Sequence, residues 1–116
     1  MGLDERLACV VEAARSKKAG RIKLLDLAGV ASFADVFAIL SGSSDRQNRA
    51  IADAIFEAMK KRGERPTSQE GDRAGAWILM DYGDLIVHVM DENTRQYYSL
   101  EELWKDGREL ELPMEQ

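Results

Sequence analysis

The single histidine and the single cysteine are the residues of this chain with the greatest potential for catalysis or metal binding. A thiolate nucleophile needs electropositive surroundings, and the sequence around Cys9 gives no sign of them, so we expect Cys9 to lie at the edge of the core. Three aspartates, Asp81, Asp84 and Asp91, lie close to His88 in the sequence. Asp91, however, alternates onto the opposite side of the predicted strand from His88. We therefore expect no metal site and no cofactor.

The serine-rich segment SGSSDRQ, residues 41–47, precedes a stretch with helical periodicity and is a second candidate site. The first amides of a helix can hold a phosphate, and a Gly-Ser entry of this kind occurs in nucleotidyltransferases. Their chemistry needs carboxylates paired on a following strand to hold metal ions. Asp53 falls in the middle of the predicted helix, and no Asp-x-Asp occurs in the chain. We therefore interpret these serines as helix caps, and we expect no catalytic residues and no enzyme activity.

The composition predicts one domain that spans residues 1–116. This length is near the common domain size, and 45% of the residues are hydrophobic, which is enough for a core without a disulfide or a metal. One cysteine cannot form an internal bridge, so a reducing cytoplasm fits best. The N-terminus has acidic residues where a signal peptide has a basic start and an apolar run. Because no apolar run approaches the roughly 20 residues of a membrane span, we expect a cytoplasmic protein without direct membrane contact.

Charge is distributed unevenly along the chain. Residues 1–80 carry 13 basic and 11 acidic side chains, whereas residues 81–116 carry 3 basic and 10 acidic ones, giving net charges of +2 and −7. The stretch 77–104 also holds both tryptophans and all three tyrosines. Strong nonspecific nucleic-acid binding needs a basic patch, so we expect no dominant nucleic-acid binding. An acidic, aromatic surface suits a basic protein partner, although an acidic tail can also serve solubility alone.

Hydrophobic periodicity divides the first half of the chain into two helices and two strands. The expected elements are helices at residues 3–20 and 44–63 and strands at residues 22–27 and 35–41. The second strand is almost continuously apolar, which predicts burial on both of its faces. Ser43 or Ser44 caps the second helix, and Gln47 completes a capping-box pattern with Ser44.

The second half of the chain is expected to hold a loop at residues 64–76, strands at 77–81 and 84–90, and a short helix at 99–104. The loop (ERPTSQEGDRAGA) is rich in glycine, proline and charge. Tyr82-Gly83 has the form of a two-residue hairpin turn with glycine in its second place. Ser99-x-x-Glu102 is a second capping-box pattern and marks the start of the last helix.

The alternation of side chains separates the hairpin into two faces. If Asp81 lies opposite Asp84, one face is wholly apolar and belongs to the core: Ile78, Met80, Leu85, Val87 and Val89. The other face has Trp77 opposite His88, Leu79 opposite Ile86, and the two aspartates near the turn. This mixture of aromatic, aliphatic and acidic groups is typical of a partner-binding surface. In the alternative interpretation a helix covers this face and His88 is a core residue, and a register slip of one residue would exchange the faces.

Several sequence blocks stand in a fixed order along the chain. They are KKAGRIKLLDL, DVFAILSGSSDRQNRAIADAI, EG, W-x-L-x-D-Y-G-D, V-H-V and R-x-Y-Y-x-L-E-x-L-W, and together they cover nearly the whole sequence. In this order they closely resemble the ribosomal silencing factor family, also called Iojap-like. Two departures, Met90 where an aromatic residue is frequent and Ala38 where a larger branched one is usual, concern packing more than function.

The resemblance implies a single α/β (α+β) domain, a mixed β-sheet flanked by helices, similar to a nucleotidyltransferase core without its catalytic carboxylates. It also implies a function. Members of the family bind protein uL14 of the large ribosomal subunit, block joining of the small subunit and repress translation when nutrients are limiting. Organelle relatives take part in assembly of the large subunit. Carried over by motif, the partner-binding residues are Trp77, Leu79, Asp81, Tyr82, Asp84 and His88.

The same motifs suggest a supporting role for the residues that follow the hairpin. We expect Arg95, Tyr97 and Trp104 to fix the hairpin to the last helix. Two other functions stay open: a homodimerising module that uses the same face on itself, and a nucleotide-binding module on a transferase-like fold.

Overall fold

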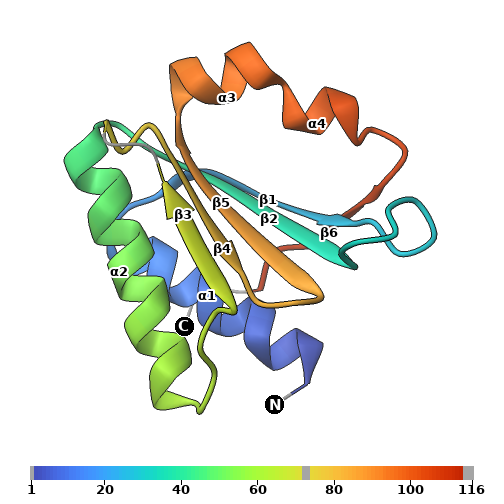
Figure 1. Ribbon diagram of the computed structural model, residues 1–116, viewed down its shortest axis with the longest axis horizontal. Coiled ribbons are helices and arrows are strands. Elements are labelled where there is room, and N and C mark those ends of the chain that lie inside the picture. The colour runs from blue at the N-terminus through green and yellow to red at the C-terminus, as the bar shows by residue number, and fades with distance from the viewer. Residues whose placement is uncertain (1, 72–73, 114–116) are drawn as a thin grey trace.

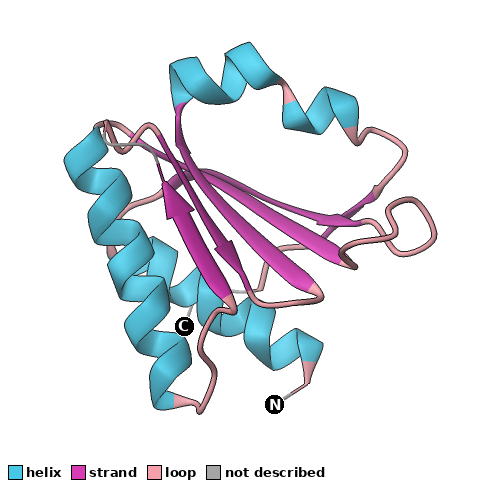
Figure 2. Ribbon diagram, in the orientation of Figure 1, coloured by secondary structure: helices cyan, strands magenta, loops and turns pink. Residues whose placement is uncertain are grey.

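The structure, a computed structural model, describes residues 2–71 and 74–113, which form a six-stranded β-sheet with helices on both faces (Figure 1, Figure 2). In chain order the elements are α1 (Leu3–Ser16), β1 (Gly20–Asp26), β2 (Val36–Gly42), α2 (Asp45–Lys61), β3 (Ser68–Gly71), β4 (Trp77–Asp81), β5 (Leu85–Asp91), α3 (Glu92–Tyr98), α4 (Leu100–Leu103) and β6 (Arg108–Leu110). No helix in these two ranges is long and apolar enough to cross a membrane.

The sheet is mixed, as predicted. Its strand order is β3-β4-β5-β2-β1-β6; β2 and β5 run parallel at its centre, and the other neighbouring strands are antiparallel. β2 is buried along its whole length, because β1 and β5 flank it and side chains pack on both of its faces. Its sequence, VFAILSG, is apolar or small throughout, so the prediction of a fully buried strand is confirmed.

Two cores lie on opposite faces of the sheet. Helices α1 and α2 pack against one face, while α3 and α4 arch over part of the other (Figure 1). The larger core, on the α1–α2 side, includes Val10, Leu40, Ile51, Ile55, Met59, Met80 and Val87. The smaller core, on the α3–α4 side, includes Leu25, Phe37, Ile39, Ile86, Met90 and Leu100. Each buried aliphatic side chain of this size contributes roughly 1.5–3 kcal/mol, so both faces of the sheet help to hold the fold together.

The β4–β5 hairpin has the predicted faces but a different register. Trp77 lies opposite Met90, and Leu79 lies opposite His88. The predicted pairing of Trp77 with His88 is therefore wrong by two residues. Because side chains alternate with a period of two, a shift of two leaves every side chain on its predicted face. The apolar face packs against α1 and α2, as expected.

The cause of the register difference is the turn. Gly83 and Asp84 form it, instead of Tyr82 and Gly83, because the Tyr82 amide donates to the Leu85 carbonyl at 2.8 Å. Gly83 adopts a φ of 90°, a left-handed conformation that favours glycine. Its amide also donates to Asp81 Oδ1 at 2.8 Å. The glycine is thus the first residue of the turn and not the second.

Three short elements escape the sequence patterns. β3 lies inside the predicted 64–76 loop and is exposed along its whole length, so it shows no alternation. α3 begins after Asp91, whose side chain accepts from the Thr94 amide at 2.7 Å. β6 has only three residues and pairs with β1 at the sheet edge. Elements this short or this exposed bury too few side chains to leave a periodic signal.

The two predicted capping boxes have different outcomes. Ser44 does cap α2, and its Oγ accepts from the Gln47 amide at 3.1 Å. Ser99 makes no such cap: its φ of 49° ends α3 in a left-handed conformation, and its Oγ donates to the Gln96 carbonyl at 2.7 Å. The capping prediction at Ser99 is therefore wrong, because a helix already occupies the residues that precede it.

Candidate binding face

An open surface lies on the α3–α4 side of the sheet, where α3 packs mainly on β5 and β2 and leaves most of β4 and β3 uncovered (Figure 1). Trp77, Leu79 and Asp81 project to this side from alternate positions of β4, and each is half-buried. Tyr98 of α3 completes the surface, with its ring centroid 4.8 Å from that of Trp77. We call these four residues the β4 face.

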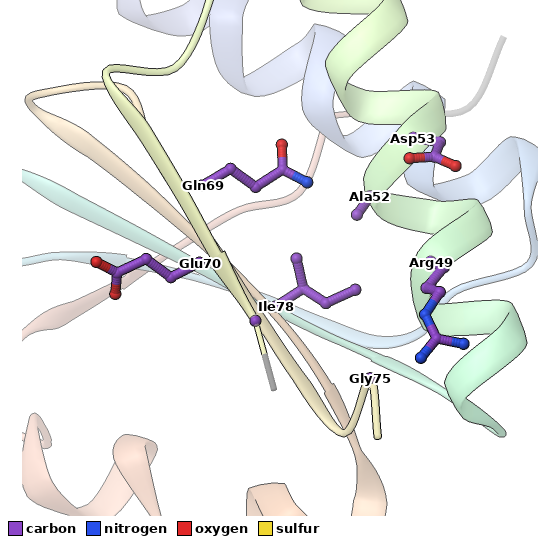
Figure 3. Close-up of a pocket in the computed structure, with 8 residues that line it drawn as sticks. Arg49, Ala52, Asp53, Gln69, Glu70, Gly75 and Ile78 are labelled. Carbon is purple, nitrogen blue, oxygen red and sulfur yellow. The ribbon is translucent and has the colours of Figure 1, made fainter. Parts of the chain in front are cut away.

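Two acidic side chains belong to this surface, one beside the β4 face and one within it. Glu70 of β3 lies directly opposite Leu79 in the sheet. Figure 3 shows its carboxylate on the side away from α2, whereas Gln69 and Ile78 point toward α2. Asp81 contributes a second carboxylate from the face itself. An aromatic centre with an acidic border suits a basic protein partner.

Contacts on two sides hold Trp77 in one orientation. Its indole Nε1 donates to His88 Nδ1 at 3.1 Å, and its ring packs against that of Tyr98. Tyr98 in turn contacts Tyr97, with ring centroids 5.0 Å apart. A side chain that is already ordered loses little conformational freedom on binding, which favours affinity. Trp77 is therefore the residue of the β4 face whose side chain is most clearly pre-organised for binding.

His88 lies beneath Trp77 and only 4% of it is exposed. Its ring packs edge-on against Phe37, with centroids 4.6 Å apart. Burial lowers the pKa of His88 to about 4, so the imidazole is neutral at pH 7 and Nδ1 can accept the indole proton. The structure thus favours the interpretation of His88 as a core histidine, and we infer that it acts by positioning Trp77.

We predict that the protein loses stability as the pH falls from 7 to 5, because its only histidine, His88, is buried in the neutral form. The pKa of His88 is 6.5 in its unperturbed state and about 4 when buried. Below pH 6.5 the unfolded chain therefore binds a proton that the folded protein does not, and stability is lost as the pH falls toward 4. The expected loss between pH 7 and pH 5 is about 2 kcal/mol, measurable by urea unfolding followed by tryptophan fluorescence.

The control for this prediction is His88→Asn, which keeps an acceptor for the indole but cannot titrate. Its free energy of unfolding should stay nearly constant between pH 7 and pH 5. If the variant showed the same pH dependence as the unchanged protein, the effect would have to come from other groups.

The other two predicted contact residues, Tyr82 and Asp84, lie at the turn and are tied to α1. Tyr82 packs in the core on the α1–α2 side, where burial raises the pKa of its phenol to about 12. Asp84 Oδ1 accepts from Arg6 at 2.6 Å, and Arg6 also donates to the Tyr82 carbonyl at 3.0 Å. The side chain of Asp84 remains 45% exposed. Of the six predicted contact residues, the structure brings Trp77, Leu79 and Asp81 together on the β4 face.

Cys9 and His88 lie on opposite faces of the sheet. Cys9 belongs to the core on the α1–α2 side, whereas His88 packs on Phe37 in the opposite core, so they cannot form a nucleophile and its base. Burial raises the pKa of the Cys9 thiol, which disfavours the thiolate. Within residues 2–71 and 74–113, no group of three or more His, Cys, Asp or Glu side chains could hold a metal ion.

A pocket of about 300 Å³ lies between α2 and β3 (Figure 3). Arg49 and Asp53 of α2 and Gln69 of β3 line it, and Arg49 pairs with Asp45 at 3.2 Å. Nucleotidyl transfer needs carboxylates held together around metal ions. Here Asp53 comes from a helix, and the carboxylate of Glu70 points away from the pocket. This geometry does not suit nucleotide chemistry.

Comparison with known proteins identifies the family. Residues 2–116 match the family model described as "Ribosomal silencing factor during starvation". The chain belongs to the ribosomal silencing factor family. A "Ribosomal silencing factor RsfS" from Halalkalibacterium halodurans is 37% identical over 112 residues, which cover 97% of this chain and 96% of the relative. A crystal structure of a protein from Chromobacterium violaceum has a TM-score of 0.87 and 31% identity, and the match covers 99% of this chain and 95% of the other.

An organelle protein is also similar. A mouse protein named "Mitochondrial assembly of ribosomal large subunit protein 1" is 30% identical over 98 residues, which cover 82% of this chain and 43% of the mouse protein. These matches confirm the family that the sequence blocks predicted. The solved structure confirms the mixed sheet flanked by helices.

In this member of the ribosomal silencing factor family, the Arg-x-Tyr-Tyr motif combines a buried anchor with an exposed pair. Arg95 is 2% exposed; its Nε bonds Glu101, and a terminal nitrogen donates to Ser41 Oγ at 2.8 Å. Arg95 thus has a structural role, but it fixes α3 to α4 and to β2, and not the hairpin to the last helix as predicted. Tyr97 is 81% exposed, so the prediction that it fixes the hairpin to the last helix is wrong. Tyr98 is not among the predicted contact residues. Asp91, which caps α3, is the sequence signal that the Arg-x-Tyr-Tyr motif lies on a helix.

Trp104 has a structural role in a different place from the one predicted. Its ring lies 5.9 Å from Phe37 of β2 and 5.6 Å from Phe33, in edge-on contacts. It therefore fixes the end of α4 to the centre of the sheet and to the connector after β1, not to the hairpin. Phe33 itself remains 54% exposed.

Proposed function

We propose that this protein binds the large ribosomal subunit through the β4 face and thereby prevents the small subunit from joining. The observation that carries the proposal is Trp77, held by His88 and Tyr98 on an uncovered face of a chain that belongs to the ribosomal silencing factor family. The partner is ribosomal protein uL14, as the family resemblance implies. Fewer joined ribosomes would lower translation when nutrients are limiting.

The chemistry of the β4 face suits such a partner. Ribosomal proteins are commonly basic, and Glu70 and Asp81 place carboxylates at the border of the aromatic centre. Border charges mainly raise the rate of association and align the partners. Trp77 and Leu79 would supply most of the affinity, because buried aromatic and aliphatic anchors dominate interface energetics.

Silencing of this kind requires only that the protein occupies the subunit-joining surface, and it requires no chemical reaction. The protein measures 34 × 33 × 28 Å along its principal axes. A body of that size bound at the subunit-joining surface prevents close approach of the small subunit by steric exclusion alone. The turn and core residues that shape the β4 face are thus functional only through the surface they hold in place.

A subunit-joining assay tests the proposal directly. Purified small and large subunits are mixed with magnesium, with and without the protein, and the joined ribosomes are separated on a sucrose gradient. We expect the joined peak to fall as the protein is added, with the protein co-migrating with the large subunit. An unchanged joined peak at saturating protein would contradict the proposal. Light scattering of the protein alone tests the alternative, a homodimer that uses the β4 face on itself.

A role in assembly of the large subunit is the second candidate function. The name of the mouse relative favours it, because that protein is named for assembly of the mitochondrial large subunit. Depletion of the protein separates the two functions. Loss of silencing would raise the fraction of joined ribosomes under starvation, whereas loss of assembly would add immature large subunits during growth.

A further inference from the structure

A group of basic side chains lies where α1 ends and α2 begins. Lys17 and Lys18 follow the last turn of α1, and Arg46 is in the first turn of α2; all three are exposed. We call these three residues the basic corner. The corner differs in charge from residues 81–116, which carry a net charge of −7.

A single glutamine holds the two parts of the corner together. Gln47 Nε2 donates to the carbonyls of Lys17 and Lys18, at 3.0 and 3.2 Å. Its Oε1 accepts from the Ser43 hydroxyl at 2.7 Å, while Ser44 caps the helix. The Ser43 and Gln47 amides at this end of α2 are thus bonded within the protein, and Lys17 and Lys18 remain exposed.

Backbone conformation gives a second reason to regard the corner as functional. Lys18 has a φ of 61° and the nearby Arg21 a φ of 46°, both in the left-handed region. Glycine or asparagine occupies this region at less cost than a lysine or an arginine does. Strained conformations that persist at such a cost concentrate at functional sites. At Lys18 this conformation ends α1, where the Ala19 amide donates to the Ala14 carbonyl, so a lysine stands at a position that glycine occupies at less cost.

The acidic residues beside the corner are already paired with other arginines. Glu92 bonds Arg21, and Asp45 pairs with Arg49 at 3.2 Å. Within the described part of the chain, no ion pair involves Lys17, Lys18 or Arg46. These three cations are thus available to an external anion.

The corner lies at the same end of the sheet as Trp77. Asn48, in the first turn of α2, donates to the Gly75 carbonyl at 2.8 Å, two residues before Trp77. The start of α3 lies at this end too, because Glu92 bonds Arg21. Figure 1 shows the beginnings of α2, α3 and β4 gathered at this end. One large partner could therefore touch the β4 face and the corner at once.

We propose that the basic corner binds the phosphodiester backbone of ribosomal RNA when the β4 face binds its protein partner on the large subunit. The inference rests on the proposed function, since the ribosome places RNA beside its proteins. Lysine and arginine contacts to phosphates are independent of sequence and weaken with salt. The corner would thus add affinity and fix orientation, which agrees with the expectation that nucleic-acid binding does not dominate.

The test compares two triple variants that lose equal charge. Lys17→Ala with Lys18→Gly and Arg46→Ala removes the corner, and glycine suits the left-handed backbone at position 18. Lys60→Ala with Lys61→Ala and Arg65→Ala removes three exposed cations near the other end of α2. Binding to bacterial large subunits is measured by co-sedimentation from 50 to 200 mM KCl, and binding to deproteinised 23S rRNA by filter retention.

We expect the corner variant to bind large subunits at least 10-fold more weakly at low salt. Its plot of log affinity against log salt should be shallower by about 2 to 3, because each phosphate contact contributes roughly 0.7 to 0.9. It should also lose binding to 23S rRNA, while the control variant keeps both. Equal losses in the two variants, or no loss in the corner variant, would overturn the inference.

The proposed function and this inference can fail separately. The 23S rRNA measurement contains no ribosomal protein, so it reports on the corner whatever the β4 face does. A corner that binds rRNA while a Trp77→Ala variant still binds subunits normally would count against the β4 face alone. If the protein blocks subunit joining but does not bind 23S rRNA, the result would count against the basic corner alone.

Discussion

Replacing Trp77 with alanine is expected to weaken binding to large ribosomal subunits by about 30-fold, roughly 2 kcal/mol, without unfolding the protein. Trp77 is half-buried, and its indole is already fixed by the hydrogen bond to His88. An ordered aromatic anchor with a polar border is the kind of residue on which interface affinity depends most. Co-sedimentation with purified large subunits over a range of protein concentrations measures the change.

Leu103→Ala is the matched control for this substitution. Leu103 is 67% exposed on α4, outside the β4 face, so its loss should leave subunit binding unchanged. His88→Phe should give an intermediate result, because it keeps a ring beneath Trp77 but removes the acceptor of the indole proton. Circular dichroism confirms that each variant is folded. Equal affinities for Trp77→Ala and the unchanged protein would remove the β4 face from the proposed function.

Much of the fold could be predicted from the sequence because its strongest patterns reflect burial. The continuous apolar run of β2 required two covered faces, and the structure supplies both. The two faces of the hairpin were also predictable, since alternation survives an error of two residues in the register. The register itself was not, because it depends on where Gly83 takes up its positive φ. β3 could not be predicted, since all of its residues are exposed.

The candidate site was less predictable because exposure depends on what other elements cover. Trp77 and His88 share a face of the hairpin, yet His88 is buried by contacts with Phe37 and Trp77. Tyr82 falls beside the turn in the sequence but packs into the core on the α1–α2 side. Tyr98 joins the surface only because α3 brings it over β4. The alternation of side chains along β4 and β5 predicts which residues share a face. How much of that face is exposed depends on which other elements pack on it.

Replacing Arg95 with alanine is expected to cost about 3 kcal/mol or more of the free energy of unfolding. Arg95 is 2% exposed, and it joins α3 to Glu101 of α4 and to Ser41 of β2. Removing one partner of a buried ion pair is strongly destabilising, because the remaining charge and hydroxyl lose their partner away from water. Urea unfolding followed by tryptophan fluorescence measures the loss. Subunit binding should weaken as well, because α3 carries Tyr98 to the β4 face.

Arg108→Ala is the comparison that isolates burial as the cause. Arg108 also pairs with an acid, Asp26, at 3.3 Å, but its side chain is 77% exposed. Exposed ion pairs contribute about 0–1 kcal/mol, so its removal should hardly change stability. A double variant, Arg95→Met with Glu101→Leu, should recover much of the stability lost in Arg95→Ala, because apolar replacement of both charges leaves neither unpaired. If Arg95→Ala cost no more than Arg108→Ala, α3 would have to be held by its apolar contacts alone.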